Sequence, residues 1–245
     1  MKGVILAGGS GTRLHPLTRI TNKHLLPLYD RPMVTYAVEA LVRAGIDELM
    51  LVTGGTHAGE FFRLLGNGQE YGIDVLAYGY QDQAGGIAEA LGLAQRFVDR
   101  DKVCVMLADN IFGRSLAPIV DNFARQESGA RIVLSHVAED EHLQHLGVAV
   151  MDGERVAEIV EKPVTPPSRF AVTGVYFYDA QVWDVLPTLT PSGRGELEIT
   201  DVNNWYVGAG QMEADVAEGF WGDAGESIDA YYEVNDFVRR NGANA

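Results

Sequence analysis

Short apolar runs alternate with longer segments of helical periodicity along the first 140 residues or so of the chain. The apolar runs predict strands over residues 3–7, 49–53, 75–80, 103–108 and 131–137. Alternation of this kind is typical of βαβ units. We therefore expect an α/β fold with a mostly parallel central sheet and helices on both faces.

The best-defined helix of this first part lies between the first two strands. Pro32 is expected in its first turn, where the missing N–H of proline costs nothing, and Gly45 is expected to end it. Its apolar face comprises Met33, Tyr36, Ala37, Ala40, Leu41 and Ala44. This spacing is that of an amphipathic helix packed on a sheet.

Beyond residue 140 the pattern changes to short strands and turns. The segments GVAVMD, RVAEIVEKP and AVTGVYFYD predict strands, and a proline-rich link separates the last two. Helices are expected to begin near Glu198 and to span residues 227–240. We expect a single domain over residues 1–245, with one half at about 1–140 and the other at about 141–245.

Composition narrows the possible partners and location. The 245 residues carry 19 basic and 34 acidic side chains, a net charge of −15, so we expect neither nucleic-acid nor membrane binding. The single cysteine, Cys104, cannot form an internal disulfide. No signal peptide and no membrane-length apolar run is recognisable, and we expect a cytoplasmic protein.

The segment KGVILAGGSGTR, residues 2–13, combines an apolar strand with closely spaced glycines and a cation. Without a Cβ, Gly8, Gly9 and Gly11 let backbone N–H groups approach phosphate oxygens. The Walker A motif fits poorly because no lysine follows the glycines, and the dinucleotide motif lacks its third glycine. The remaining alternative is a strand-to-helix turn that binds no ligand. The nearby cations Arg13 and Lys23 favour phosphate binding over this alternative.

Two aspartates are candidate Mg²⁺ ligands. Asp109 directly follows the apolar run VCVMLA, so it should lie at the carboxyl end of a buried strand, where open α/β sheets bind ligands. Asp223, in GFWGDAGES, could supply a second carboxylate. Mg²⁺ often takes only one or two protein carboxylates and completes its shell with water and phosphates. Capping or turn roles remain the alternative for both residues.

Polar residues at other strand ends could contact a sugar or a base. Glu161 and Lys162, in VEKP, could bind a sugar and its phosphate, or form an exposed ion pair. Gln81 carries an amide that could read a base edge through both donor and acceptor. Glu196 and Glu198 precede a predicted helix, where acidic residues are favourable in any case.

Taken together, these motifs resemble one family from end to end. They read LAGGSGTRLHPLT, NKHLLPLYDRPM, QDQAGGIAEAL, LADNIF, VEKP, AVTGVYFYD and RGELEITDVNNWY, in that order. The chain resembles the sugar-nucleotide-forming nucleotidyltransferases, and among them the glucose-1-phosphate thymidylyltransferases. The resemblance implies a Rossmann-like nucleotidyltransferase fold with a nucleotide-binding half followed by a sugar-phosphate-binding half.

The same resemblance implies an activity and a set of site residues. The enzyme would transfer a thymidylyl group from dTTP to glucose 1-phosphate, with Mg²⁺ as cofactor. Nucleotide-binding residues would be Leu6, Gly8, Gly9, Gly11, Thr12, Arg13, Gln81, Gly86 and Asp109. Sugar-phosphate-binding residues would be Lys23, Asn110, Gly147, Glu161, Lys162, Val172 and Tyr176. Arg13, Lys23 and Lys162 would be catalytic, and Asp109 and Asp223 would bind the metal.

Three motifs depart from the family pattern. LADN has alanine where glycine is usual, HLGV has leucine where tyrosine is common, and WGDAGES replaces W-x-D-T-G-T. The chain resembles the short form, without a C-terminal regulatory extension, and the family implies a homo-oligomer. A uridylyltransferase or another sugar-1-phosphate nucleotidyltransferase is the nearest alternative. A nucleotide-binding regulatory module and an NAD-dependent oxidoreductase are more distant ones.

Overall fold

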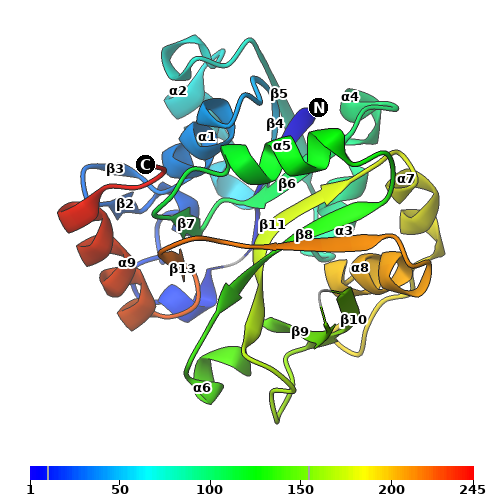
Figure 1. The fold of residues 1–245 in the computed structure, drawn as a ribbon. Coiled ribbons are helices and arrows are strands. Elements are labelled where there is room, and N and C mark those ends of the chain that lie inside the picture. Colours follow the sequence, from blue (N-terminus) through cyan, green and yellow to red (C-terminus); the bar gives the residue numbers. More distant parts are fainter. Residues whose placement is uncertain (10, 154) are drawn as a thin grey trace.

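The computed structural model describes residues 1–9, 11–153 and 155–245, and it is built around one large twisted sheet (Figure 1). Four strands form its parallel part, in the order β6-β1-β4-β5. Their bounds are β1 Lys2–Ala7, β4 Glu48–Gly54, β5 Val75–Gln81 and β6 Val103–Leu107. All four predicted strands of this part are confirmed to within two residues at each end.

The rest of the sheet is mainly antiparallel. Strand β11 pairs antiparallel with β6, β8 and β9, and β9 pairs antiparallel with β10, whereas β12 runs parallel to β8. The bounds are β8 Ala130–His136, β9 Gly147–Asp152, β10 Arg155–Glu161, β11 Phe170–Tyr178 and β12 Met212–Val216. Strand β8, predicted at 131–137, is confirmed as a strand but already belongs to this antiparallel part, although the sequence pattern changes only beyond residue 140.

Helices cover both faces of the sheet, as predicted. The helices on one face are α1 Val34–Arg43, α2 Ala58–Leu65 and α5 Ala117–Arg125. Those on the other face are α3 Ile87–Gly92, α4 Gln95–Val98, α7 Val182–Val185 and α8 Ile199–Gly208. Alternate residues of β1 enter the two cores, with Ile5 on the first side and Val4 and Leu6 on the second. None of the described helices is long and apolar enough to cross a membrane.

Two short pairings flank the main sheet. Strand β7 (Asn110–Phe112) pairs with β13 (Trp221–Asp223), and β2 (Pro27–Leu28) pairs with β3 (Arg31–Pro32). The last helix, α9 (Ile228–Asn241), packs over β2 and β13, and α6 (Asp140–Leu143) lies in the connection from β8 to β9. The β7–β13 pair matters most for the site, because it joins segments about 110 residues apart.

The boundaries of α1 give one confirmation and one correction. Gly45 has φ 83°, and the N–H groups of Gly45 and Ile46 donate to Val42 and Leu41, which is the Schellman ending of a helix. Pro32, however, lies before the helix, in β3, and not in the first helical turn. The fixed φ of proline suits an extended strand as well as a first turn, so the sequence pattern could not separate these two positions.

Candidate active site

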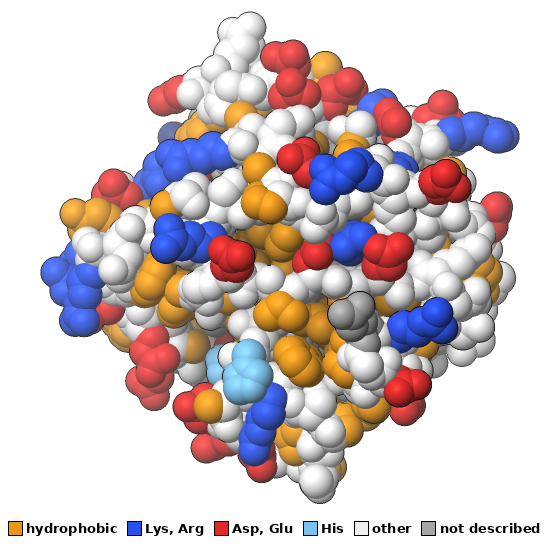
Figure 2. All heavy atoms as spheres, viewed as in Figure 1, with side chains coloured by type: hydrophobic (Ala, Val, Ile, Leu, Met, Phe, Trp, Pro, Cys, Tyr) orange, Lys and Arg blue, Asp and Glu red, His pale blue; other side chains and the backbone are white. Residues whose placement is uncertain are grey.

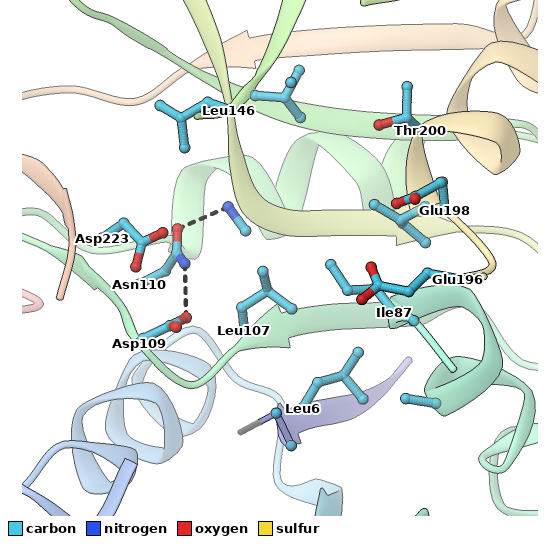
Figure 3. Close-up of a pocket in the computed structure, with 18 of the residues that line it drawn as sticks. Leu6, Ile87, Leu107, Asp109, Asn110, Leu146, Glu196, Glu198, Thr200 and Asp223 are labelled. Carbon is cyan, nitrogen blue, oxygen red and sulfur yellow. Dashed lines mark hydrogen bonds between the residues drawn. The ribbon is translucent and has the colours of Figure 1, made fainter. Parts of the chain in front are cut away.

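A cavity of about 290 Å³ opens at the carboxyl ends of the parallel strands. Most of the residues proposed from the sequence line it: Leu6, Gly8, Gly9, Arg13, Lys23, Gln81, Gly86, Asp109, Asn110, Gly147, Glu161, Lys162, Val172, Tyr176 and Asp223. In Figure 3, Asp109, Asn110 and Asp223 lie together at one side and Glu196, Glu198 and Thr200 lie at the other, with apolar side chains between them. The fold thus brings distant motifs to one cavity.

The pairing of β7 with β13 brings the two candidate metal ligands together. Asp223 is the register partner of Asn110, the residue after Asp109. The backbone N–H of Ala224 donates to the carbonyl of Asp109 over 2.9 Å. The segment GDAGES is therefore held beside the end of β6 by backbone hydrogen bonds, and neither aspartate caps a helix.

Asp109 lies in a cluster of cationic and polar groups. Its carboxylate forms an ion pair with Lys23, and Nε2 of the buried His24 lies 3.7 Å from its Oδ2. Burial acts to raise the pKa of Asp109, but Lys23 and His24 together hold it well below its usual range. Burial also acts to lower the pKa of Lys23, which the two aspartates raise above its ordinary value. Both members of the ion pair are therefore charged at neutral pH.

Asp223 has the opposite electrostatic character. Burial, followed by repulsion from Asp109, raises its pKa to about 7. Its Oδ1 accepts a 2.8 Å hydrogen bond from the N–H of Gly225, and it forms no ion pair with any described residue. A carboxylate held beside a second one, without a cation of its own, fits a divalent metal.

The metal would depend on few protein ligands. Within the described part of the chain, no group of three or more His, Cys, Asp or Glu residues is arranged to hold an ion. Asp109 and Asp223 therefore provide two carboxylates at most, and water and substrate phosphates would complete the shell, as is usual for Mg²⁺.

Asn110 fixes the orientation of the aspartate before it. Its Oδ1 accepts from the N–H of Gly174 (2.8 Å) and from Nε1 of Trp221 (2.7 Å), while its Nδ2 donates to Asp109 (3.2 Å). A Cβ at Gly174 would lie 2.6 Å from Nδ2, so only glycine fits there. Asn110 lines the cavity, and its Oδ1 is occupied by two protein donors, while its Nδ2 makes one hydrogen bond to Asp109.

The glycine-rich loop is only partly at the cavity. Gly9 has φ 98° and lines it with Gly8 and Arg13, as expected for a backbone that approaches phosphates. Gly11 and Thr12, also proposed to bind the nucleotide, are not among the lining residues. Gly11, with φ 61°, instead accepts from the Thr18 hydroxyl over 2.7 Å. These two residues shape the turn that carries Arg13.

The proposed base-reading loop is tied to the segment before α8. The N–H of Leu197 donates to the carbonyl of Gly85 (2.8 Å), and its own carbonyl accepts from Ala88 (3.2 Å). Gly86 has φ 101°, and a Cβ there would lie 2.4 Å from the Leu197 carbonyl oxygen. Glycine is thus required at this position for two independent reasons, its φ and the close approach of Leu197.

Charged side chains paired with one another form the opposite wall of the cavity. Arg194 donates to Glu198 (2.8 Å) and lies 3.4 Å from Glu161. Thr200 donates to Glu161 over 2.6 Å, and Lys162 Nζ lies 3.4 Å from the same carboxylate. Burial acts to raise the pKa of Glu198, but Ser192 and Arg194 lower it below its ordinary value. The Glu198 carboxylate is therefore held in place as an ionised acceptor.

Lys162 has a backbone conformation that non-glycine residues rarely adopt. Its φ is 45°, and its N–H donates to the carbonyl of Leu146 over 3.0 Å. Such left-handed residues cost free energy and concentrate at functional sites. The conformation supports a functional role for Lys162 rather than an incidental surface ion pair.

Sequence reasoning did not identify several lining residues as part of the site. They include His24, Leu107, His145, Leu146, Arg194, Thr200, Asn203 and Trp221. His24 follows the proposed Lys23, and Thr200 lies in the recognised motif GELEIT, so adjacency was the available signal. Arg194 is the first residue of the longer motif RGELEITDVNNWY, but its several acidic partners become apparent only in the folded chain.

With this geometry established, comparisons with known proteins define the class. The family model described as "Nucleotidyl transferase" matches residues 2–241, and the chain belongs to this family. Glucose-1-phosphate thymidylyltransferase from Neisseria meningitidis serogroup A is 40% identical over 98% of this chain and 83% of its own length. The protein of the same name from Mycolicibacterium smegmatis is 42% identical over 98% of this chain and 82% of its own length.

Solved structures agree with the fold. A Bacillus anthracis protein, provisionally named a glucose-1-phosphate thymidylyltransferase and crystallised with sucrose, superposes with a TM-score of 0.92 at 45% identity. The alignment covers 98% of this chain and 95% of that one. A UDP-glucose pyrophosphorylase complexed with UDP-glucose superposes with a TM-score of 0.83 at 24% identity, over 98% of each chain, and supports the fold alone. Membership of the nucleotidyl transferases implies nucleotide and sugar-phosphate substrates and a divalent metal.

Proposed function

We propose that this enzyme transfers a thymidylyl group from dTTP to glucose 1-phosphate, releasing pyrophosphate and forming dTDP-glucose. The observation that carries the proposal is the cavity itself, whose lining combines the Asp109–Asp223 pair with the cations Arg13, Lys23 and Lys162. The names of the relatives at 40–42% identity support the same substrates. They disfavour the uridylyltransferase alternative.

We assign the two substrates to the two walls of the cavity. The nucleotide would lie against Leu6, Gly8, Gly9 and Arg13, with its base at Gln81 and Gly86. The sugar phosphate would lie against Gly147, Glu161, Lys162, Val172 and Tyr176. This placement corresponds to the proposed halves of the chain, about residues 1–140 and 141–245, with Lys23 and Asp109 between them.

The reaction joins two polyanions, so charge neutralisation and positioning are the main tasks. A phosphate oxygen of glucose 1-phosphate attacks the α-phosphorus of dTTP in line, the bond to the bridging oxygen breaks, and pyrophosphate leaves. The nucleophile is already anionic, so no general base is required. Mg²⁺, held by Asp109 and Asp223, would supply additional positive charge at the phosphates.

The chain's own cations would act at different places. Arg13 presents a guanidinium, which is suited to bidentate contact with phosphate, beside the glycine-rich loop. Lys162 would contact the attacking sugar phosphate. Lys23 is mostly buried and paired with Asp109, so it would hold a fixed positive charge where the nucleotide and sugar phosphates meet. Because these positive charges are already in place, the protein need not rearrange charged groups as the reaction proceeds.

The direct test is pyrophosphate release with Mg²⁺ across combinations of nucleotide and sugar phosphate. We expect fast release for dTTP with glucose 1-phosphate and slower release for CTP, ATP and GTP. Thymine and uracil differ by one methyl group, which gives only about 10–200-fold discrimination in an apolar pocket, so measurable UTP turnover is expected. Silence with every pair, despite dTTP binding, would instead indicate a regulatory nucleotide-binding module. A homo-oligomer stays a prediction from the family resemblance, and a cytoplasmic location stays a prediction from the sequence.

A further inference from the structure

The side-chain amide of Gln81 is held in one orientation. Gln81 ends β5 and is 9% exposed. Its Nε2 donates to Oε2 of Glu89 over 2.7 Å and to the carbonyl of Gly86 over 3.3 Å. A primary amide nitrogen has two hydrogens. Both are therefore directed at protein acceptors and away from a ligand.

Glu89, the first of these acceptors, lies on α3 and is itself closely packed. A Cβ placed on Gly85 would lie 1.9 Å from Oε2 of Glu89, so the carboxylate rests directly against that glycine. An ionised carboxylate can accept hydrogen bonds but cannot donate them. Glu89 therefore requires that the nitrogen of the Gln81 amide, and not its oxygen, point toward it.

The oxygen of the same amide faces the proposed nucleotide site. Gln81 lines the cavity, and a Cβ on Gly8 would lie 3.3 Å from its Oε1, which places this atom beside the glycine-rich loop. Among the described residues, no side chain or backbone group donates a hydrogen bond to Oε1. Gln81 can thus offer a bound base an acceptor, but no donor.

The orientation has a consequence for base choice. Thymine and uracil carry one ring donor on their pairing edge, N3–H, whereas N3 of cytosine is an acceptor. An amide that could flip would serve either base, because rotation by half a turn exchanges its donor and acceptor. We propose that Glu89 is a positioning residue that locks the Gln81 amide as an acceptor for N3–H and so disfavours cytosine nucleotides. This inference rests on the proposed function, because it assumes a pyrimidine at Gln81.

The discrimination would come from an unfavourable contact that excludes cytosine. With the amide locked, cytosine would place its N3 lone pair against Oε1, and two acceptors would meet without a hydrogen between them. A buried polar group left without its partner costs more than an average hydrogen bond contributes. Discrimination of this kind depends on blocking the wrong partner as much as on binding the right one.

The test is the kcat/KM for dTTP, dUTP and dCTP with glucose 1-phosphate in wild type and Glu89→Ala. Alanine keeps the helix propensity of α3 while it removes the acceptor. We expect the preference for dTTP over dCTP to fall about tenfold or more. The preference for dTTP over dUTP should stay unchanged, because both bases carry N3–H. A role in folding alone would not separate these two ratios.

Three further variants complete the experiment. Glu89→Gln retains an oxygen that can accept from Gln81, so it should recover part of the discrimination against dCTP. Gln83→Met removes an exposed polar side chain from the same loop and should leave both ratios unchanged. If Glu89→Ala loses its cooperative thermal transition, Glu89→Ser removes the same acceptor and takes its place.

Two failures can be told apart. An unchanged dTTP:dCTP ratio in a folded Glu89→Ala enzyme would overturn the positioning role while leaving the proposed function intact. Absence of dTTP turnover in the wild type would contradict the proposed function instead. In that case the same ratio is measured as calorimetric binding of dTTP, dUTP and dCTP. A preference for the two N3–H bases that Glu89→Ala abolishes would still support the lock, and its persistence would overturn it.

Discussion

The two walls of the cavity present polar groups by different physical means. On the side of β1 and β5, glycines bring the backbone close, and Gly9 and Gly86 adopt φ values that other residues avoid. On the side of β10 and α8, Arg194, Glu161 and Glu198 hold one another through ion pairs. The first wall should therefore be sensitive to added atoms, and the second to lost charge.

Figure 2 extends the comparison to the protein surface. On the face shown, acidic and basic side chains of the described residues are interspersed rather than gathered into one basic patch, in keeping with the net charge of −15. Attraction of an anionic nucleotide must therefore come from local groups within the cavity. This explains why the positioning of a few cations there matters more than the overall field.

The largest effect on turnover is expected from a change at Asp223, which lies beside Asp109 where the two walls meet. Asp223→Asn should reduce turnover by at least about 10²-fold, because it removes a carboxylate that would hold the Mg²⁺ whose charge neutralises the substrate phosphates. The same change should stabilise the metal-free protein at pH 8, because it removes repulsion with Asp109. Each 1 kcal/mol of stabilisation would raise Tm by about 2–4 °C in a protein of this size.

Asp109→Asn is the informative counterpart of this variant. It should also reduce turnover, but it leaves Lys23 buried without its partner and should destabilise the fold by about 3–5 kcal/mol. Kinetics together with thermal melts in a metal chelator would measure both quantities. Equal melting temperatures for the two variants would contradict the electrostatic difference between the aspartates.

The next effect tests whether the cavity wall on the side of β1 and β5 is sensitive to added atoms. Gly86→Ala adds a Cβ at 2.4 Å from the Leu197 carbonyl oxygen in a backbone with φ 101°. We expect the KM for dTTP to rise about tenfold or more, with a melting temperature several degrees lower, because such strain costs roughly 1–3 kcal/mol. Gly92→Ala, at a helical glycine with open space around it, is the control: it should leave the KM unchanged and should not lower the melting temperature.

A smaller effect should follow from loss of charge in the opposite wall. Arg194→Met leaves Glu161 and Glu198 without their shared cation, so we expect the KM for glucose 1-phosphate to rise several-fold. Because Arg194 is 42% exposed, its pairs should contribute no more than about 1 kcal/mol to stability. Arg31→Met breaks a comparable pair with Glu39 away from the cavity and should leave this KM unchanged. A dTTP-specific defect in Arg194→Met would mean that the walls are wrongly assigned.

The smallest effect concerns the contact between α6 and the residues around β13. His142 stacks on Trp221, and its Nε2 lies 2.5 Å from Glu226. This pair raises the pKa of His142 above its ordinary 6.5. A raised histidine pKa adds stability that is complete below the unfolded value and is lost as pH rises through the folded value. The imidazole is 33% exposed, so the contribution should be at most about 1 kcal/mol.

His142→Gln tests this pH dependence. The melting temperature of wild type should exceed that of the variant near pH 6, and the difference should disappear as the pH rises above the raised pKa. Thermal melts from about pH 6 to 9 provide the measurement. A difference that is constant over this range would show that stacking of His142 on Trp221, and not its ion pair with Glu226, stabilises the protein here.

The two walls also differ in how far the sequence predicted them. The glycine-rich loop and the strand before it are consecutive residues, so residues 2–13 carry their own signal. Arg194 acquires its role from three acidic neighbours whose positions depend on β10 and the start of α8. The β7–β13 pair has three residues in each strand, too few for a periodic pattern, yet it helps to bring Asp223 beside Asp109. From the residues alone, Asp223 could be offered as a second carboxylate, but its spacing from Asp109 could not show that the two meet.

The two backbone hydrogen bonds of Leu197 have a practical meaning for anyone who redesigns this enzyme. Residues 85–88 and 196–198 are joined into one corner of the cavity. A substitution chosen to admit a different sugar on the 196–198 side will shift the loop that faces the base. Sugar range and nucleotide preference are therefore not separate traits here, and libraries that vary one should be screened for both.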